Sequence, residues 1–162
     1  MQHTRFEVQF AEKQASLQGM DTVEFFMSAN PGQPLRELSE IASGGEMSRI
    51  MLAFKTVLAQ NEHIGTLIFD EIDTGIGGNI VVKVAEKLQL VSRYAQVICV
   101  THSPQIAAKA DTHFQIQKHT TEDATITSVH VLDEQASIYE LARMLGGEED
   151  YQLQHAKELK HI

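Results

Sequence analysis

The sequence predicts an α/β fold of mainly parallel strands flanked by helices, with an antiparallel hairpin added. Two short apolar runs, 66–69 and 96–100, alternate with segments of helical periodicity, an order typical of parallel α/β proteins. Two later segments, 112–118 and 125–132, alternate apolar and polar residues and so predict an antiparallel pair. With 162 residues, the chain is expected to form a single domain with a substantial core.

The composition limits where the chain works and what it contacts. Its net charge of −9, with scattered lysines and arginines, argues against a general nucleic-acid-binding surface. Cys99 is the only cysteine, so no internal disulfide can form, which fits a reducing cytoplasm. The apolar runs are too short to cross a membrane, and the N-terminus lacks the apolar core of a signal peptide. We therefore expect a cytoplasmic protein with no membrane contact, in which any contact with DNA is local or made by parts outside this chain.

The first third of the chain predicts two strands and a long helix. Residues 5–10 alternate apolar and polar side chains, which predicts a strand, and 22–28 predicts a second strand, so the two can pair as a hairpin or an edge ribbon. The residues Asn30-Pro31-Gly32 mark a turn after the second strand. A helix is expected from about 45 to 60, because apolar residues recur there at spacings of three and four.

The middle of the chain predicts two buried strands separated by a helix. The runs 66–69 and 96–100 are apolar after their first residues, Thr66 and Gln96, which predicts burial on both faces. The helix between them is expected from about 79 to 92. A short helix near 105–109 follows Ser103-Pro104, since proline suits a first helical turn.

The last part of the chain predicts the antiparallel pair around a turn at 121–123, followed by a helix. Apolar residues at helical spacing cover 138–145, and Gly146-Gly147 ends that helix. The tail from 151 to 162 is weakly helical. The histidines outside the motifs show no metal-ligand spacing and are expected to lie mostly on the surface.

The residues Ser43-Gly44-Gly45-Glu46, here called the signature loop, precede the first long helix. They bring a hydroxyl and backbone N–H groups to a helix N-terminus, where an anion such as phosphate is favoured. A serine followed three residues later by glutamate is also a capping box, which only stabilises the helix. The two interpretations are compatible, and caps are the more common of the two.

An acidic pair and a histidine follow the two buried strands. Asp70 and Glu71 come after the first strand, and His102 comes after the second. Ligands bind outside the carboxyl ends of parallel strands. We expect these two strands to be parallel neighbours, so that the three side chains share one crevice. Two adjacent carboxylates suit a hydrated Mg²⁺ and a general base for water. Each feature alone also has a structural explanation, such as a helix cap.

Three segments together resemble the heads of ABC-type ATPases. Ala42-Ser43-Gly44-Gly45-Glu46 resembles the signature motif, Leu67-Ile68-Phe69-Asp70-Glu71 the Walker B strand, and Val100-Thr101-His102 the switch histidine. Their order and spacing are similar to the C-terminal lobe of heads in the structural-maintenance-of-chromosomes (SMC) group. That lobe is an incomplete P-loop NTPase fold. Within the group, the chain resembles bacterial proteins of DNA double-strand-break repair and recombination. This closer likeness lies in 28–35, 42–53, 69–78, 100–108 and 142–147.

The resemblance assigns the signature loop to a contact between two heads. Ser43 and the amides of Gly44 and Gly45 would contact the γ-phosphate of ATP held by a second head, with Glu46 completing the motif. The loop after the Walker B strand would lie at the same dimer interface, through Asp73, Thr74, Gly75, Gly77 and Gly78. Related heads usually carry an aspartate near the position of Gly77, and its absence leaves open which group communicates between the two sites.

The same resemblance assigns catalysis to the strand ends. Asp70 would hold Mg²⁺ through water. Glu71 would orient and deprotonate the attacking water, and His102 would contact the γ-phosphate.

The phosphate-cradling loop of such heads, G-x-x-x-x-G-K-[ST], is missing, because no glycine of the chain is followed by lysine. In the related heads it lies in an N-terminal lobe beyond a long coiled coil. We therefore expect a C-terminal half-head that is inactive alone. The expected partners are the N-terminal Walker A lobe of the same protein, a second copy joined through the heads, and DNA bound by the full-length protein. The expected location is the bacterial cytoplasm, with recruitment to the nucleoid on DNA damage.

Two other functions remain open from the residues themselves. The first is a metal-dependent hydrolase with Asp70, Glu71, Asp73 and His102 as ligands, although neighbouring side chains of a strand point to opposite faces. The second is a non-catalytic assembly module in which the signature loop only caps a helix. That module would not respond to ATP even with the missing lobe supplied.

Overall fold

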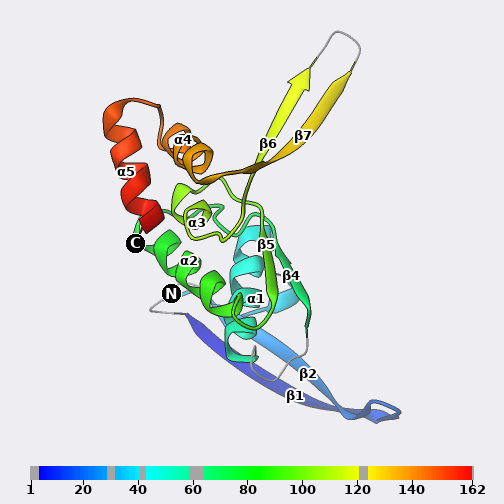
Figure 1. The fold of residues 1–162 in the computed structure, drawn as a ribbon. Helices are drawn as coiled ribbons and strands as arrows, with labels where there is room; N and C mark the ends of the chain where they lie inside the picture. The colour runs from blue at the N-terminus through cyan, green and yellow to red at the C-terminus, as the bar shows by residue number, and fades with distance from the viewer. Residues whose placement is uncertain (1–3, 29–31, 41–42, 59–63, 121–123, 162) are drawn as a thin grey trace. The chain divides into compact units, whose positions relative to one another are not determined.

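The structure is a computed structural model that divides into two compact units, Met1–Ser43 and Gly44–Ile162 (Figure 1). The residues that it describes are 4–28, 32–40, 43–58, 64–120 and 124–161. The mixed α/β class is confirmed. Among the described residues, however, only one strand pair is parallel, so the prediction of mainly parallel strands is wrong. The strands outside that pair belong to antiparallel sheets, whose pairing reflects chain reversals at turns.

The first unit is an antiparallel sheet with strand order β1-β2-β3, followed by a short 3₁₀-helix, η1. Its elements are β1 (Arg5–Ser16), β2 (Gly19–Ser28), β3 (Arg36–Glu37) and η1 (Leu38–Glu40). This confirms the predicted hairpin and extends it through residues 11–16, where the pairing with β2 continues at Ala11 and Glu12 and, after a shift in register, at Ser16. The register places Val8 opposite Phe25 and Phe10 opposite Val23, so apolar side chains share one face of the ribbon. The predicted turn at 30–32 lies mostly outside the described residues.

The second unit contains the parallel pair. Its first elements are α1 (Gly44–Leu58), β4 (Thr66–Phe69), α2 (Asn79–Val91) and β5 (Gln96–Cys99), which confirms the predicted order of helices and strands. β4 and β5 are parallel neighbours, with Thr66 opposite Gln96 and Phe69 opposite Cys99. The two strands therefore end side by side.

One face of the parallel pair packs against the core. The side chains of Leu67 and Phe69 on β4, and of Val97 and Cys99 on β5, contact an apolar cluster from α1, α2 and α3. The buried members of that cluster are Leu52, Phe69, Ile72, Val81, Val84, Ala85, Leu88, Val91 and Ile106.

The other face of the pair is exposed. Ile68, Ile98 and Val100 expose 71%, 45% and 48% of their surface. The expectation of burial on both faces is therefore wrong for the structure described, because the described helices of this unit pack on the side of Leu67, Phe69, Val97 and Cys99. The apolar composition of the exposed side remains typical of parallel strands that are covered on both faces.

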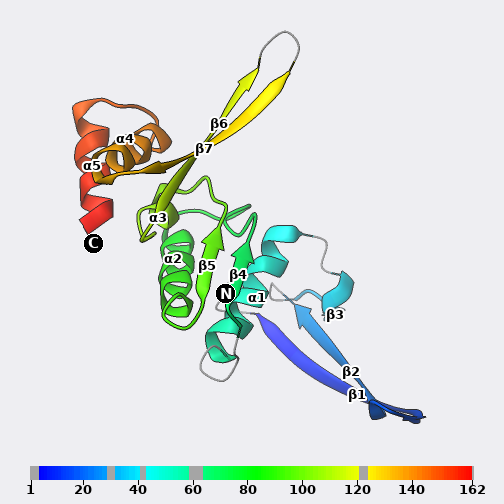
Figure 2. The ribbon, with the colours of Figure 1, turned by 45° about the vertical axis from the view of Figure 1, so that its right-hand side comes forward.

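The rest of the unit is a hairpin and a helical group (Figures 1 and 2). Its elements are α3 (Pro104–Ala107), β6 (His113–Thr120), β7 (Thr125–Leu132), α4 (Glu134–Met144) and α5 (Asp150–His161). The antiparallel hairpin is confirmed, while the turn expected at 121–123 lies outside the described residues. α3, α4 and α5 share a second core with Leu141 and Ala156 fully buried, so the weakly helical tail does form a helix.

A polar cluster lies where β6 packs on α4. His113 Nδ1 lies 2.9 Å from the Oγ of the buried Ser137, and Arg143 donates two hydrogen bonds, of 2.8 and 2.6 Å, to Glu140. Burial, together with the nearby charge of Lys160, lowers the pKa of His113, and Glu140 opposes this shift. Hydrogen bonds from Arg143 are the largest cause of the lowered pKa of Glu140. His113 is therefore a half-buried packing residue, unlike the surface position expected for most histidines.

Acid is expected to destabilise this unit through His113. Its folded-state pKa is below the ordinary value of 6.5, so the unfolded chain binds more protons as the pH falls through that value. The contribution of neutral His113 to stability is fully present above about pH 6.5, and it is lost as the pH falls from there through the lowered pKa of the folded state. The variant His113→Asn cannot gain this charge, so its melting temperature should change less than that of the wild type between about pH 7.5 and about pH 5.5.

The matched control is His119→Asn, since His119 is exposed on the same strand. Thermal unfolding followed by circular dichroism at several pH values gives the comparison. Identical slopes for the wild type and both variants would contradict the role assigned to His113.

Candidate functional site

The carboxyl ends of β4 and β5 bring the predicted strand-end residues to one edge. Val100 N–H donates to the Phe69 carbonyl at 2.9 Å, so the two chains leave the sheet together. Asp70 follows β4 directly, and its Oδ1 accepts a hydrogen bond of 2.9 Å from Glu71 N–H. Both carboxylates are exposed. The prediction that these strands are parallel neighbours is confirmed.

Glu71 has an unusual backbone. Its φ is +56°, and no other non-glycine residue in the described ranges has a positive φ. A left-handed conformation costs a residue with a Cβ about 1–2 kcal/mol, and such strain gathers at functional sites. The Glu71 carbonyl accepts a hydrogen bond of 3.0 Å from Thr74 N–H, which closes a tight turn. Nothing in the residue type signals this conformation, so sequence reasoning missed it.

The glycines of the signature loop lie against that turn. A Cβ on Gly44 would come within 2.9 Å of Glu71 Oε2, and one on Gly45 within 2.7 Å of the Glu71 carbonyl oxygen. The second contact is with backbone, so position 45 has room only for glycine. Gly44 is exposed and Gly45 is buried. Ser43 and Glu46, at either end of the loop, are each half-buried.

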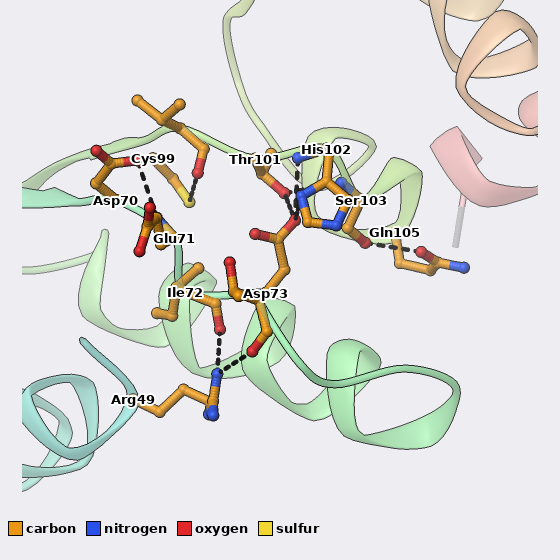
Figure 3. Close-up of polar contacts among 12 residues, drawn as sticks. Arg49, Asp70, Glu71, Ile72, Asp73, Cys99, Thr101, His102, Ser103 and Gln105 are labelled. Atoms are coloured by element: carbon orange, nitrogen blue, oxygen red, sulfur yellow. Dashed lines mark hydrogen bonds and ion pairs between the residues drawn. The ribbon is translucent and has the colours of Figure 1, made fainter. Parts of the chain in front are cut away.

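Asp73 connects the two strand ends. Its Oδ2 accepts hydrogen bonds from Thr101 Oγ1 and from His102 N–H at 3.0 Å, and it lies 3.2 Å from His102 Nδ1 (Figure 3). The Asp73 side chain is 2% exposed, whereas that of His102 is 78% exposed. The imidazole is therefore anchored at one nitrogen and open to solvent.

If their partner groups come from another lobe or a second copy, the motif loops should be solvent-exposed, but Gly45 and Asp73 are buried and Ser43 and Glu46 are only half-exposed. Gly45 and Asp73 are buried because each contacts the backbone or side chains of a neighbouring loop. The rest of the predicted interface loop is exposed, namely Thr74, Gly75, Gly77 and Gly78.

Two residues of α1 also contact this loop, and sequence reasoning gave them no role. Ser48 Oγ donates to the Asp70 carbonyl at 2.9 Å. Arg49 Nη1 donates to the carbonyls of Ile72 at 3.1 Å and Thr74 at 2.9 Å. The available signal was a polar pair, Ser48-Arg49, which follows the signature loop after one intervening residue, but its partners are more than twenty residues away in sequence.

Cys99 lies close to the carboxylates but is not a nucleophile. Burial, together with the nearby charges of Asp73 and Asp70, raises the pKa of its thiol to about 12. The thiol therefore stays protonated, and it packs as a half-buried apolar group at the end of β5.

The four ligands of the hydrolase alternative do not form a metal cluster. Within the described residues, no three His, Cys, Asp or Glu side chains gather in a way that could hold a metal ion. Asp73 contacts His102, while the Asp70 carboxylate accepts from the Glu71 backbone. The geometry therefore does not support that alternative.

Within the described residues, no helix combines the length and the apolar character needed to span a bilayer.

Relatives of this chain are DNA repair proteins named RecN. The RecN of Halalkalibacterium halodurans is 44% identical over 166 residues, which are 98% of this chain and 29% of the relative. That of Bacillus subtilis is 46% identical over 148 residues, or 90% of this chain and 26% of the relative. The RecN of Treponema pallidum is 48% identical over 169 residues, which are 98% of this chain and 29% of the relative. No family model matches the chain.

Solved SMC heads share the fold. The Smc head domain with a coiled coil and joint from Pyrococcus yayanosii matches with a TM-score of 0.62 and 22% identity, over 86% of this chain and 26% of that chain. A structure from work on ATP-driven dimerization and DNA-stimulated activation of SMC ATPases matches with a TM-score of 0.51 and 20% identity. It covers 89% of this chain and 84% of that chain.

The chain spans less than a third of the length of these curated relatives, 26% to 29%. Its fold resembles part of an SMC head. Over nearly all of its own length, the chain is homologous to the DNA repair protein RecN.

Proposed function

We propose that this chain is the C-terminal half of an ATPase head in a RecN-like protein that acts in DNA double-strand-break repair. The observation that carries the proposal is that β4 and β5 are parallel neighbours, so that the acidic pair Asp70–Glu71 and the residue His102 follow strands that end at the same edge. The homology to RecN and the likeness to SMC heads support it.

The proposed partner inside the protein is an N-terminal lobe with the Walker A loop, joined through a coiled coil. It would supply the lysine and the backbone cradle for the β- and γ-phosphates. The exposed apolar face of the parallel pair, with Ile68, Ile98 and Val100, supports this partner, because parallel sheets are normally covered on both faces. DNA would be bound by the full-length protein, in the bacterial cytoplasm.

ATP is the proposed substrate and Mg²⁺ the proposed metal. Asp70 fits a hydrated Mg²⁺, because its carboxylate is exposed at a strand end and is fixed by the Glu71 N–H. The metal would neutralise charge that develops on the phosphate oxygens.

Glu71 is the proposed general base. Its exposed carboxylate would orient the attacking water and take its proton. His102 would donate a hydrogen bond to the γ-phosphate, and Asp73 would hold its ring in place through Nδ1.

The signature loop would act in trans. Ser43 and the N–H groups of Gly44 and Gly45 would bind the γ-phosphate of ATP on a second head, where the N-terminus of α1 favours an anion. The exposed residues Thr74, Gly75, Gly77 and Gly78 would lie at the same interface, in a homodimer formed through the heads.

The variant Glu71→Gln tests the base in a complete head, with this chain joined to its Walker A lobe. It keeps the size and hydrogen bonding of the side chain but removes the base, so turnover should fall about 10²–10⁴-fold. ATP binding should survive, and ATP-bound dimers should accumulate. Phosphate release and light scattering measure the two effects.

The control for that experiment is Glu86→Gln, which removes a carboxylate from the exposed side of α2 and should retain the wild-type rate. A Glu71→Gln head that turns over ATP as fast as the control would remove Glu71 from the mechanism.

The variant Ser43→Arg tests the contact in trans. The longer, positively charged side chain should leave the melting temperature near that of the wild type but prevent ATP-dependent dimerisation of the complete head. Ser92→Arg makes the same change at the exposed C-terminal end of α2 and should dimerise normally. Normal dimerisation of Ser43→Arg would favour a signature loop that only caps its helix.

A further inference from the structure

We propose that Arg49 is a positioning residue for Glu71. With Ser48, it holds the backbone on both sides of Glu71, so that the start of α1 determines where the Glu71 carboxylate lies. The geometry is independent of any reaction, while its catalytic consequence depends on the function proposed above.

The contacts form a bracket around Glu71. Ser48 Oγ binds the carbonyl of Asp70, one residue before Glu71, at 2.9 Å. Arg49 Nη1 binds the carbonyl of Ile72, one residue after it, at 3.1 Å, and the carbonyl of Thr74 at 2.9 Å. Figure 3 shows the Arg49 side chain reaching from α1 to these carbonyls.

Glu71 needs such a bracket because its backbone is strained. A glutamate at φ +56° relaxes to an ordinary conformation unless its surroundings determine the geometry. Local support comes from the Thr74 N–H bond to the Glu71 carbonyl at 3.0 Å, within the same turn. The bonds from α1 are the long-range support, since they connect this turn to a separate helix.

The residue type suits the task. Both bonds leave a single nitrogen, Nη1, whose two N–H groups can serve two acceptors in a fixed geometry. A lysine has a compact ammonium on a flexible stem and would hold the two carbonyls less rigidly. The acceptors are backbone carbonyls, so Arg49 acts on the path of the chain rather than on the charge of Glu71.

The same helix opens with the signature glycines. Gly45 approaches the Glu71 carbonyl so closely that an added Cβ would lie 2.7 Å from it. Three residues in the first two turns of α1, Gly45, Ser48 and Arg49, therefore contact the turn around Glu71. If a second head displaced this end of α1, the backbone that carries the proposed base, Glu71, would move with it.

The first experiment uses amide hydrogen exchange in this 162-residue chain to test whether the contacts from α1 hold the turn around Glu71. In Arg49→Gln, exchange of the Thr74 amide should accelerate at least about tenfold, because the turn that it closes has lost its support. The Val100 amide, bonded to Phe69 between β4 and β5, should keep its rate. Arg93→Gln, an exposed arginine after α2, is the matched control. An unchanged Thr74 rate, or equal acceleration at Val100, would overturn the local role.

The second experiment measures turnover in the complete head. In Arg49→Gln, kcat should fall about 10²-fold, the usual effect of misplacing a catalytic group by about 1 Å. The KM for ATP should stay within about twofold, since no ATP contact is removed. Arg49→Lys should fall between this variant and the wild type.

A double variant separates positioning from general stabilisation. If Arg49 acts through Glu71, adding Arg49→Gln to Glu71→Gln should lower kcat no further. If kcat of the double variant instead falls below that of Glu71→Gln by the whole factor measured for Arg49→Gln alone, the inference is overturned while the proposed function stands. If Glu71→Gln itself retains wild-type turnover, the proposed function fails. The exchange experiment still tests whether Arg49 supports the turn around Glu71.

Discussion

The parallel pairing of β4 and β5 is the constraint on which the candidate site depends. Because Phe69 lies opposite Cys99, the residues after both strands emerge at the same edge. Residues about thirty positions apart in sequence can then meet, and Asp73 reaches Thr101 and His102. The register in turn depends on one shared core, in which Leu67, Phe69, Val97 and Cys99 pack with residues of α1, α2 and α3. A slip of one residue would turn these side chains to the uncovered face.

The backbone of the loop after β4 is the second requirement. Glu71 adopts a left-handed conformation that its residue type does not favour, and contacts from elsewhere hold it there. Gly45 allows the close approach of α1, and Ser48 and Arg49 bind carbonyls on either side. Asp73 is anchored in the opposite direction, toward the end of β5. The exposed carboxylates of Asp70 and Glu71 thus stand on a backbone that is fixed from two sides.

Local patterns in the sequence predicted most elements of this fold. Helical periodicity located α1, α2 and α4, and alternation located both hairpins, because these signals lie within one segment. The pairing of β4 with β5 followed from the order of strands and helices. Periodicity could not show which face of a strand this chain covers, so the exposure of Ile68 and Ile98 was missed. The overall balance of parallel and antiparallel pairs was also missed, since the N-terminal ribbon has a sheet of its own.

The site was predicted less completely than the fold. Motif spacing identified Asp70, Glu71 and His102, but the burial of Asp73 and the contacts of Arg49 depend on tertiary approach. The most direct test of the central claim is Mg²⁺-dependent ATP turnover by this 162-residue chain, alone and after joining to a RecN Walker A lobe. The account predicts no turnover above background for the chain alone, because the P-loop contacts are missing, and slow hydrolysis once the lobe is joined. Robust turnover by the chain alone, or none by the joined head, would contradict it.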